Sequence, residues 1–158
     1  MNSRIDLYKA AAGAYRAMLG LEEYIATCSL EKPLIELVKM RASQMNGCAY
    51  CIDMHSKDAR ALGESEQRLY ALDGWRETPF YSERERAALA WTEAVTLIGE
   101  THAPDEMFEQ VRQQFKDNEI ADLTLVIATI NAWNRIAISL RAVPGTYQPA
   151  AERATVRG

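Results

Sequence analysis

The sequence predicts an all-α protein, a helical bundle in a single domain. Helix-favouring residues and helix start and stop signals recur along the 158 residues, whereas the alternating apolar pattern of β-strands is nearly absent. The length suits one domain, because domains commonly hold roughly 100–200 residues. Hydrophobic residues at 48% and charged residues at 25% are typical of a globular protein. We place the domain at residues 1–145 and expect 146–158, which are small and polar, to form a flexible C-terminal tail.

Seven helices are expected, and most of their ends are marked in the sequence. The first is rich in Ala, Leu, Met and Glu, with Gly13 and Gly20 as expected breaks or close-approach points. The turn-forming pair Asn46-Gly47 ends the second helix, and Gly63 ends the third. The predicted helices cover residues 4–28, 33–45, 48–62, 65–72, 82–98, 104–115 and 117–142.

The starts of the helices are predicted from prolines and capping residues. Pro33 and Pro104 suit a first helical turn, where the missing N–H of proline costs no hydrogen bond. Ser82 with Glu85 forms a capping box, in which each side chain accepts a hydrogen bond from the other residue's backbone N–H. The remaining predicted N-caps are Ser65 and either Asp117 or Asn118.

The last predicted helix contains IADLTLVIATINAWNRIAISL, which is apolar almost all round. A helix of this kind is buried in the protein or at a contact between subunits. We therefore expect Trp133, Asn134 and Arg135 to be packing or interface residues. If the arginine is buried, it needs a carboxylate or carbonyl partner.

Composition excludes several classes of function. The net charge of −4 and the isoelectric point near 5.3 argue against nucleic acid as a partner, because phosphate binding needs a basic face. We expect no membrane span, since no apolar run approaches the roughly 20 residues that a span requires. The N-terminal MNSRIDLYKAAAG lacks the apolar stretch of a signal peptide, and three cysteines do not suit a secreted disulfide framework. These features predict a cytoplasmic protein.

The stretch NGCAYCIDMH, residues 46–55, is the candidate functional site. The turn places Cys48 and Cys51 at the start of a helix, where unpaired backbone N–H groups favour the thiolate. Cys48, Cys51 and His55 follow one another at intervals of three and four residues and therefore share one helix face. His55 is thus placed to act as a base for a nucleophilic thiol.

Other interpretations of these residues remain open from spacing alone. A C-x-x-C pair with a histidine also has the character of a zinc site, although structural zinc needs four protein ligands. Two cysteines can equally be small buried hydrophobic residues. Cys28 and His102 lie in other segments: we expect Cys28 in the core and His102 in a loop or cap.

A longer motif resembles a known family. Glu36 stands twelve positions before Cys48 in the frame ELVKMRASQMNGCAYCIDMH, and the later INAWNRIAI continues the likeness. This pattern resembles the carboxymuconolactone decarboxylase superfamily, and within it the alkylhydroperoxidase (AhpD-like) branch, over roughly residues 5–142. The resemblance implies an AhpD-like helical bundle that forms homo-oligomers, commonly trimers or hexamers.

The resemblance also implies a peroxidase cycle. Cys51 would attack a hydroperoxide and become a sulfenic acid, and Cys48 would condense with it to a disulfide. Glu36 and His55 would relay the proton. No bound cofactor or metal is implied; an external dithiol, such as a lipoyl group on a partner protein, would reduce the disulfide.

One position departs from the well-studied AhpD enzymes, which carry a histidine directly before the second cysteine. That position is Tyr50, which we expect to line the pocket without acting as a base. An alternative function is a non-catalytic, redox-sensing or stress-related oligomer that uses the same disulfide. The decarboxylase activity for which the superfamily is named is disfavoured, since the members with that activity lack the cysteine pair.

Overall fold

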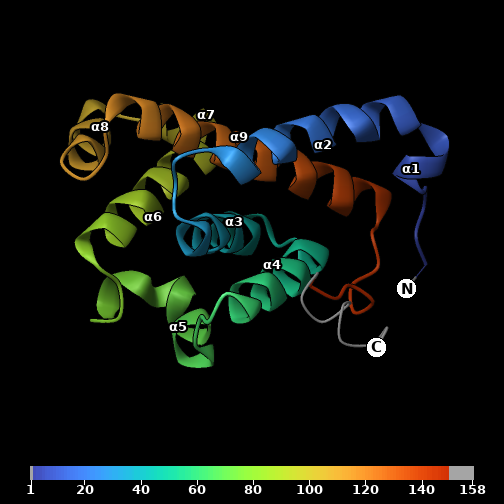
Figure 1. Ribbon diagram of the computed structural model, residues 1–158, viewed down its shortest axis with the longest axis horizontal. Coiled ribbons are helices and arrows are strands. Elements are labelled where there is room, and N and C mark those ends of the chain that lie inside the picture. Colours follow the sequence, from blue (N-terminus) through green and yellow to red (C-terminus); the bar gives the residue numbers. More distant parts are fainter. Residues whose placement is uncertain (1, 150–158) are drawn as a thin grey trace.

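The computed structural model describes residues 2–149, and in this part of the chain it contains helices and no strand (Figure 1). The predicted all-α fold is therefore confirmed. The elements are α1 (Leu7–Ala10), α2 (Ala12–Thr27), α3 (Lys32–Asn46), α4 (Ala49–Ala61), α5 (Glu66–Ala71), the 3-10 helix η1 (Leu72–Glu77), α6 (Glu83–Thr96), α7 (Ile98–Thr101), α8 (Asp105–Arg112) and α9 (Asp117–Leu140).

Helix α3 is the centre of the bundle. It is seen end-on in Figure 1, with α9 on one side and α4 on the other, and it packs against α4, α6 and α9. Leu37 and Val38 on α3 are fully buried. Pro33 lies in the first turn of α3, as the sequence predicts. Because α3 and α4 are consecutive and joined by one tight turn, side chains from both can meet at one site.

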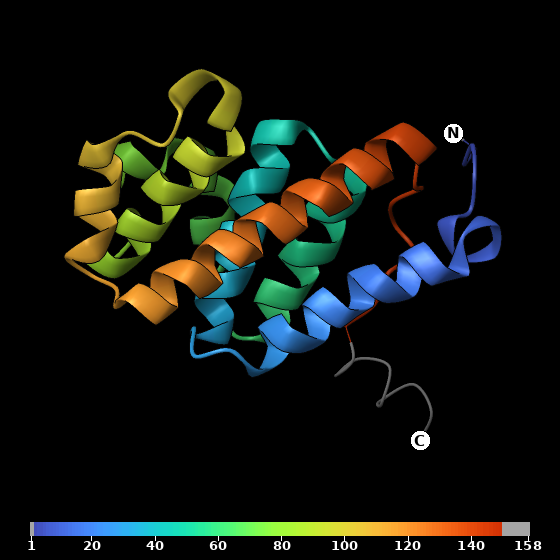
Figure 2. The ribbon, with the colours of Figure 1, turned by 90° about the horizontal axis from the view of Figure 1, so that it is seen from above.

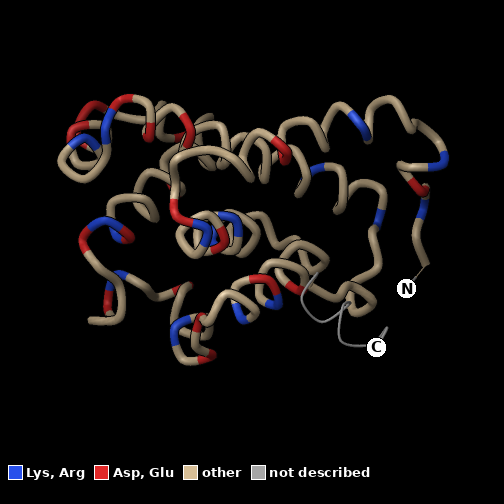
Figure 3. Tube along the Cα trace, in the orientation of Figure 1, with Lys and Arg blue, Asp and Glu red and all other residues tan. Residues whose placement is uncertain are grey.

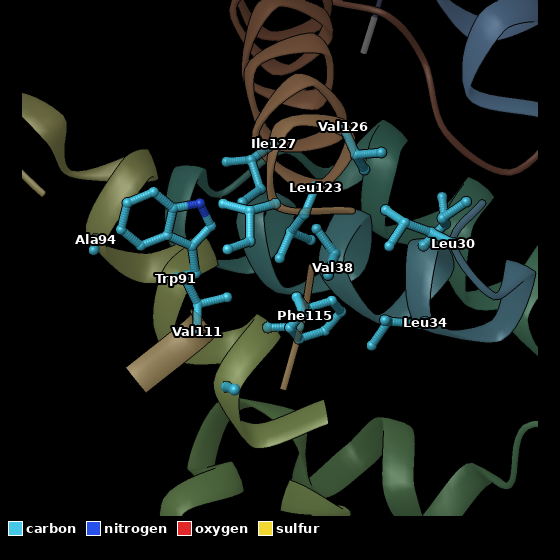
Figure 4. Close-up of a cluster of buried hydrophobic side chains, with 14 of the residues drawn as sticks. Leu30, Leu34, Val38, Trp91, Ala94, Val111, Phe115, Leu123, Val126 and Ile127 are labelled. Carbon is cyan, nitrogen blue, oxygen red and sulfur yellow. The ribbon is translucent and has the colours of Figure 1, made fainter. Parts of the chain in front are cut away.

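The main hydrophobic core lies where α3, α6 and α9 meet (Figure 4). Val38 from α3, Trp91 from α6 and Ile127 from α9 belong to this cluster. Phe115, just before α9, belongs to the same cluster. Burying apolar side chains of this size contributes roughly 1.5–3 kcal/mol each, so this core holds the helices that carry the site.

Helix α9 combines burial with exposure. By length and hydropathy (1.4) it would be long and apolar enough to cross a membrane, but core helices of soluble proteins have the same properties. It packs against α3, α6 and α2 (Figure 2), and its Val126, Ile127 and Asn134 are fully buried. Ile138, towards its end, is 47% exposed. The prediction of a buried helix therefore holds for one face of α9, whereas another face is exposed.

The N-terminal prediction needs a correction. The single helix expected over 4–28 is divided at Ala11, whose φ of −148° and ψ of 61° leave the helical region, and not at Gly13 or Gly20. Asp6 caps the one-turn α1 by accepting a hydrogen bond from the Lys9 N–H (3.2 Å). The glycines lie inside α2, so their freedom is not what ends the helix.

Several helix ends match the sequence, and a few differ. The caps at Ser65 and Ser82 are present, including the capping box. The N-cap of α9 is Lys116 and not Asp117 or Asn118, because the Glu119 carboxylate accepts the Lys116 N–H at 2.9 Å and fixes the first turn there. The N-cap of α8 is Pro104 itself, and α9 ends at Leu140 rather than 142. His102 ends α7 in a left-handed conformation (φ 51°), as expected of a cap residue.

After α9 the chain returns to α4, on the side seen at the lower right of Figure 1. The Gly145 N–H donates to the Asp53 carboxylate (3.0 Å), and the Tyr147 hydroxyl donates to Asp58 (2.8 Å). Lys57 donates to the Tyr147 carbonyl (3.1 Å). The expected tail, 146–158, thus begins with residues that are bonded to α4, and its residues 150–158 lie outside the described part of the chain.

Charged residues of both signs are interspersed along residues 2–149 rather than gathered on one side (Figure 3). Many of them form ion pairs, such as Arg84 with Glu31 and Glu119.

Candidate active site

The turn between α3 and α4 shapes the site. Gly47 adopts a left-handed conformation (φ 67°, ψ 32°), and its N–H and that of Cys48 bond to the last carbonyls of α3. Glycine suits this position because a β-carbon disfavours positive φ. Cys48 then becomes the N-cap of α4, and its sulfur accepts a hydrogen bond from the Cys51 N–H at 3.4 Å.

Cys48 and Cys51 form a disulfide, with their Cα atoms 5.3 Å apart. Both are buried, at 1% and 2% exposure. The i,i+3 spacing at the helix start therefore brings the two sulfurs together, as a reversible redox pair requires.

His55 lies one turn beyond Cys51 and contacts Glu36. Its Nδ1 is 2.8 Å from the Glu36 Oε2, across the interface of α4 and α3. His55 is 4% exposed and the Glu36 side chain 14%. With Nδ1–H donated to the carboxylate, Nε2 is left with a lone pair, as in a histidine that serves as a base. The structure thus brings all four predicted site residues to one place, whereas their chemical roles remain predictions.

A network of hydrogen-bonded amide side chains lies beside the turn between α3 and α4. Asn46, the last residue of α3, donates to the Oδ1 atoms of Asn131 (3.0 Å) and Asn134 (2.9 Å) on α9. Asn134 is fully buried and donates in turn to Ser43 (3.0 Å). Arg135 is exposed, and it donates to the backbone oxygen of Asn131 (2.9 Å). The bonds of Asn46 and Ser43 connect the end of α3, directly before the turn, to α9.

A cavity of about 890 Å³ opens beside the disulfide. It lies between α1 and α2 on one side and α3, α4 and α9 on the other, and its wall is mostly apolar and aromatic. Cys51, His55 and Glu36 line it, and Cys48 does not. Among the apolar lining residues are Tyr8, Tyr15, Ile35, Met54, Trp133 and Leu140. Cys51 is therefore the sulfur that a bound molecule would meet.

Tyr50 lines this cavity, as expected. Burial raises the pKa of Tyr50 above its ordinary value of 10.0, and the neighbouring Tyr15 and Asp53 act in the same direction. The hydroxyl is thus protonated at neutral pH and can donate a hydrogen bond, but it does not serve as a base.

Several further charged residues of the cavity were not predicted, among them Glu22, Lys39 and Asp58. Lys39, only 5% exposed, pairs with Glu22 of α2 at 2.6 Å, and the Trp133 indole N–H donates to the same carboxylate (2.9 Å). Asp58 lies one turn after His55 and accepts the Tyr147 hydroxyl. The spacing of Asp58 after His55 was visible in the sequence, but the Lys39 pair depends on how α2 packs.

Glu36, His55 and Asp58 are the described residues that come nearest to a metal-binding group, with one ligand atom from each within 4.8 Å of the others. Glu36 and His55 bond to one another, and both Asp58 oxygens accept from Tyr147. We therefore do not assign a metal centre. The zinc alternative through Cys48 and Cys51 needs two thiolates, whereas here the two sulfurs are bonded to each other.

Cys28 is a free thiol and is half-buried. It packs at the edge of the main core and also lines the cavity, so the expectation of a core position is met only in part. The reason is that the C-terminal end of α2 covers the core with one face and the cavity with another.

The comparison with family models decides the classification. Residues 12–94, which include all four predicted site residues, match the model of the carboxymuconolactone decarboxylase family. The chain belongs to the carboxymuconolactone decarboxylase family. The resemblance noted in the sequence is thereby confirmed.

Relatives of this family member share the fold over nearly its whole length. The uncharacterized protein YdfG of Bacillus subtilis is 45% identical over 140 residues, covering 89% of this chain and 95% of YdfG. A crystal structure from Agrobacterium tumefaciens, of a protein of unknown function suggested to be the antioxidant defence protein AhpD, is 46% identical. It superposes with a TM-score of 0.90 and covers 92% of this chain and 100% of that one.

More distant solved structures show the fold alone. The AhpD-core protein of Ralstonia eutropha, an uncharacterized peroxidase-related protein, is 20% identical with a TM-score of 0.78, covering 88% of this chain and 74% of its own. The debrominase Bmp8, solved with 2,3,4-tribromopyrrole, is 22% identical with a TM-score of 0.72, covering 93% of this chain and 76% of its own.

Proposed function

We propose that this family member is a thiol-dependent peroxidase of the alkyl hydroperoxide reductase type. The observation that carries the proposal is the arrangement of Cys51: it is bonded to Cys48, lies one turn from the Glu36–His55 pair, and faces a largely apolar cavity. A nucleophile, a nearby base and a group that orients the base are the parts that such chemistry needs.

In the reduced enzyme, Cys51 would give its proton to His55 and attack the terminal oxygen of a hydroperoxide. A sulfur–oxygen bond forms, the oxygen–oxygen bond breaks, and the alcohol leaves with the proton returned by His55. The Cys48 sulfur then attacks the Cys51 sulfur while the Cys48 thiol proton passes to the departing hydroxide, so that the disulfide forms and water leaves. A dithiol, such as a lipoyl group on a partner protein, reduces the disulfide by exchange.

The order in which the cysteines act is part of the proposal. The helix start stabilises a thiolate at Cys48 more than at Cys51, since Cys48 is the N-cap. Access favours the reverse order, because Cys51 lines the cavity and Cys48 does not. We give access more weight, because a buried thiolate without a path to the peroxide cannot react.

The test is to titrate the reduced protein with cumene hydroperoxide and to follow the loss of thiols. Cys51→Ser is expected to abolish turnover, whereas Cys48→Ser is expected to stop the cycle with a sulfenic acid at Cys51, detected by mass spectrometry with a dimedone probe. Cys28→Ser is the matched control and retains turnover. A rate no faster than that of free cysteine would exclude the peroxidase.

A second candidate is a redox-sensing oligomer that uses the same disulfide. It is favoured by exposed apolar side chains, namely Ile5 just before α1 at 52%, Tyr8 in α1 at 62% and Ile138 near the end of α9 at 47%. These would be covered in a homotrimer or hexamer. Light scattering with and without dithiothreitol separates the two candidates. A large change in size without turnover favours the sensor. In either case we propose a cytoplasmic location, where a dithiol donor would be available.

A further inference from the structure

We propose that Asp58 is a positioning residue of the proton-transfer group: its carboxylate, anchored by the Tyr147 hydroxyl, favours the protonated form of His55 and so helps Cys51 lose its proton. The inference rests on the proposed function, in which Cys51 is the reacting thiol. It adds the Asp58 carboxylate to the Glu36–His55 pair. It also adds Tyr147, from the segment after α9, to a site otherwise built from α3 and α4.

The first support is geometric. Asp58 follows His55 by three residues on α4, so both lie on one helix face, and both line the cavity. One ligand atom each of Glu36, His55 and Asp58 lie within 4.8 Å of one another. The imidazole therefore has a carboxylate from α3 on its Nδ1 and a second carboxylate close by. Along the helix Asp58 is seven residues from Cys51, so its charge acts mainly on His55.

The second support is the anchoring of Asp58. The Tyr147 hydroxyl lies 2.8 Å from one Asp58 oxygen and 3.0 Å from the other. Tyr147 is itself held through its carbonyl, which accepts a hydrogen bond from Lys57 at 3.1 Å. A carboxylate fixed in this way keeps its distance to the imidazole rather than turning into solvent.

The third support is the charge balance around Asp58. Burial raises the pKa of Asp58 above its ordinary 3.8; the Tyr147 hydrogen bond opposes this, Glu36 adds to it, and His55 and Lys39 oppose it. Lys39 is already paired with Glu22. Two partly buried carboxylates thus lie close to one imidazole, and Lys39, the other cation near them, already has a partner. The groups that face Asp58 are Glu36 and Lys39 from α3, His55 from α4 and Tyr147 from the C-terminal segment.

The test measures the proton affinity of Cys51 without any peroxide. In a Cys28→Ser, Cys48→Ser background only Cys51 reacts with iodoacetamide, and the rate is followed from pH 5 to pH 10. Asp58→Asn keeps the shape of the side chain and removes its charge. We expect the midpoint of the pH profile to rise by about one unit, which is about a tenfold slower reaction below the midpoint.

Matched variants separate charge from anchoring. Asp58→Glu restores most of the wild-type profile, and Tyr147→Phe shifts the midpoint in the same direction by less. Asp53→Asn is the control: Asp53 also holds the C-terminal segment, through the Gly145 N–H, but does not line the cavity, so its profile matches that of the parent.

An unchanged midpoint in Asp58→Asn overturns the inference, and so does an equal shift in Asp53→Asn, which would mean that only docking of the segment matters. If Asp58→Asn does not fold, Asp58→Glu and Tyr147→Phe still decide, since the inference fails when Tyr147→Phe has the parent profile. Failure of the proposed function has a different result. The wild-type thiol would not react with hydroperoxide, while the pH profile of alkylation would still shift in Asp58→Asn.

Discussion

The His55 imidazole and the Glu36 carboxylate meet at 2.8 Å, each contributed by a different helix on either side of one tight turn. Nineteen residues separate them in sequence. Because both side chains are largely buried, the contact is shielded from water and fixes the orientation of the ring. Its contribution to the chemistry can be measured by changing Glu36 alone.

The first prediction concerns Glu36→Gln. An amide keeps a hydrogen-bond acceptor for Nδ1 but removes the charge that stabilises the protonated imidazole, so peroxide reduction should slow by about 10²-fold. The melting temperature should change little, because the shape is kept. The measurement is the rate of sulfenic acid formation in the Cys48→Ser background. Glu23→Gln, at an exposed position on α2, is the control, and equal rates in both variants would contradict the relay.

The second prediction compares the same substitution at two glycines. Gly47→Ala places a β-carbon at φ 67° and should destabilise the fold by about 1–2 kcal/mol. Gly20→Ala, inside α2, should stabilise it by about 0.5–1 kcal/mol. A new β-carbon at either site meets no atom within 4 Å, so the difference comes from the backbone alone.

Urea denaturation of the reduced protein measures both changes. Gly47→Asn is the matched variant, because asparagine tolerates the left-handed region better than alanine, and it should recover part of the loss. The same sign of change at Gly47 and Gly20 would show that the conformation of the turn is not what the glycine supplies.

The positions of Cys48, Cys51 and His55 could be predicted from the sequence, because they lie on one helix at intervals of three and four residues. Glu36 was predicted from the family resemblance, since periodicity within a helix does not fix a contact between two helices. The caps at Ser65 and Ser82 were predictable for a similar reason, since they depend on contacts within one turn.

The parts that were missed depend on packing between distant segments. Glu22 reaches Lys39 only because α2 packs beside α9, and Tyr147 reaches Asp58 only because the chain turns back after α9. The break at Ala11 was missed because local preference favours helix there, whereas the backbone of Ala11 leaves the helical region and ends α1 after one turn. Periodicity within a segment contains no information on such long-range contacts.

The third prediction is a pH dependence of stability that comes from Glu93. Burial alone would raise its pKa, but hydrogen bonds from Trp75 (2.8 Å) and Arg76, with the charge of Arg41, lower it below the ordinary 4.5. A lowered pKa stabilises the fold at pH values above 4.5, and this contribution is lost as the pH falls through the folded value.

Glu93→Gln should therefore be less stable than the wild type by about 2 kcal/mol at pH 7, and the difference should shrink below pH 4.5. Urea denaturation between pH 3 and pH 7 measures it. Glu109→Gln, at an exposed pair, is the control and should show a nearly constant difference. A stability difference between Glu93→Gln and the wild type that grew at acid pH would contradict the prediction.

The last prediction concerns the buried pair of Lys39 and Glu22 on the cavity wall. The Lys39 side chain is 7% exposed and that of Glu22 28%, so the two partners are not equivalent. Glu22→Gln leaves a buried ammonium without its counter-charge and should cost about 2–3 kcal/mol. Lys39→Met should cost less, because Glu22 is partly hydrated and retains the hydrogen bond from Trp133.

The double variant, with both substitutions, decides whether the pair acts as a unit. It should recover at least 1 kcal/mol relative to the sum of the single changes, about the coupling expected between contacting residues. Urea denaturation of the wild type, the two single variants and the double variant gives the double-mutant cycle. Because methionine and glutamine leave no buried charge, the double variant should be more stable than Glu22→Gln alone. If its loss of stability equalled the sum of the two single losses, the pair would not act as a unit, because Lys39 would reach water when Glu22 is changed.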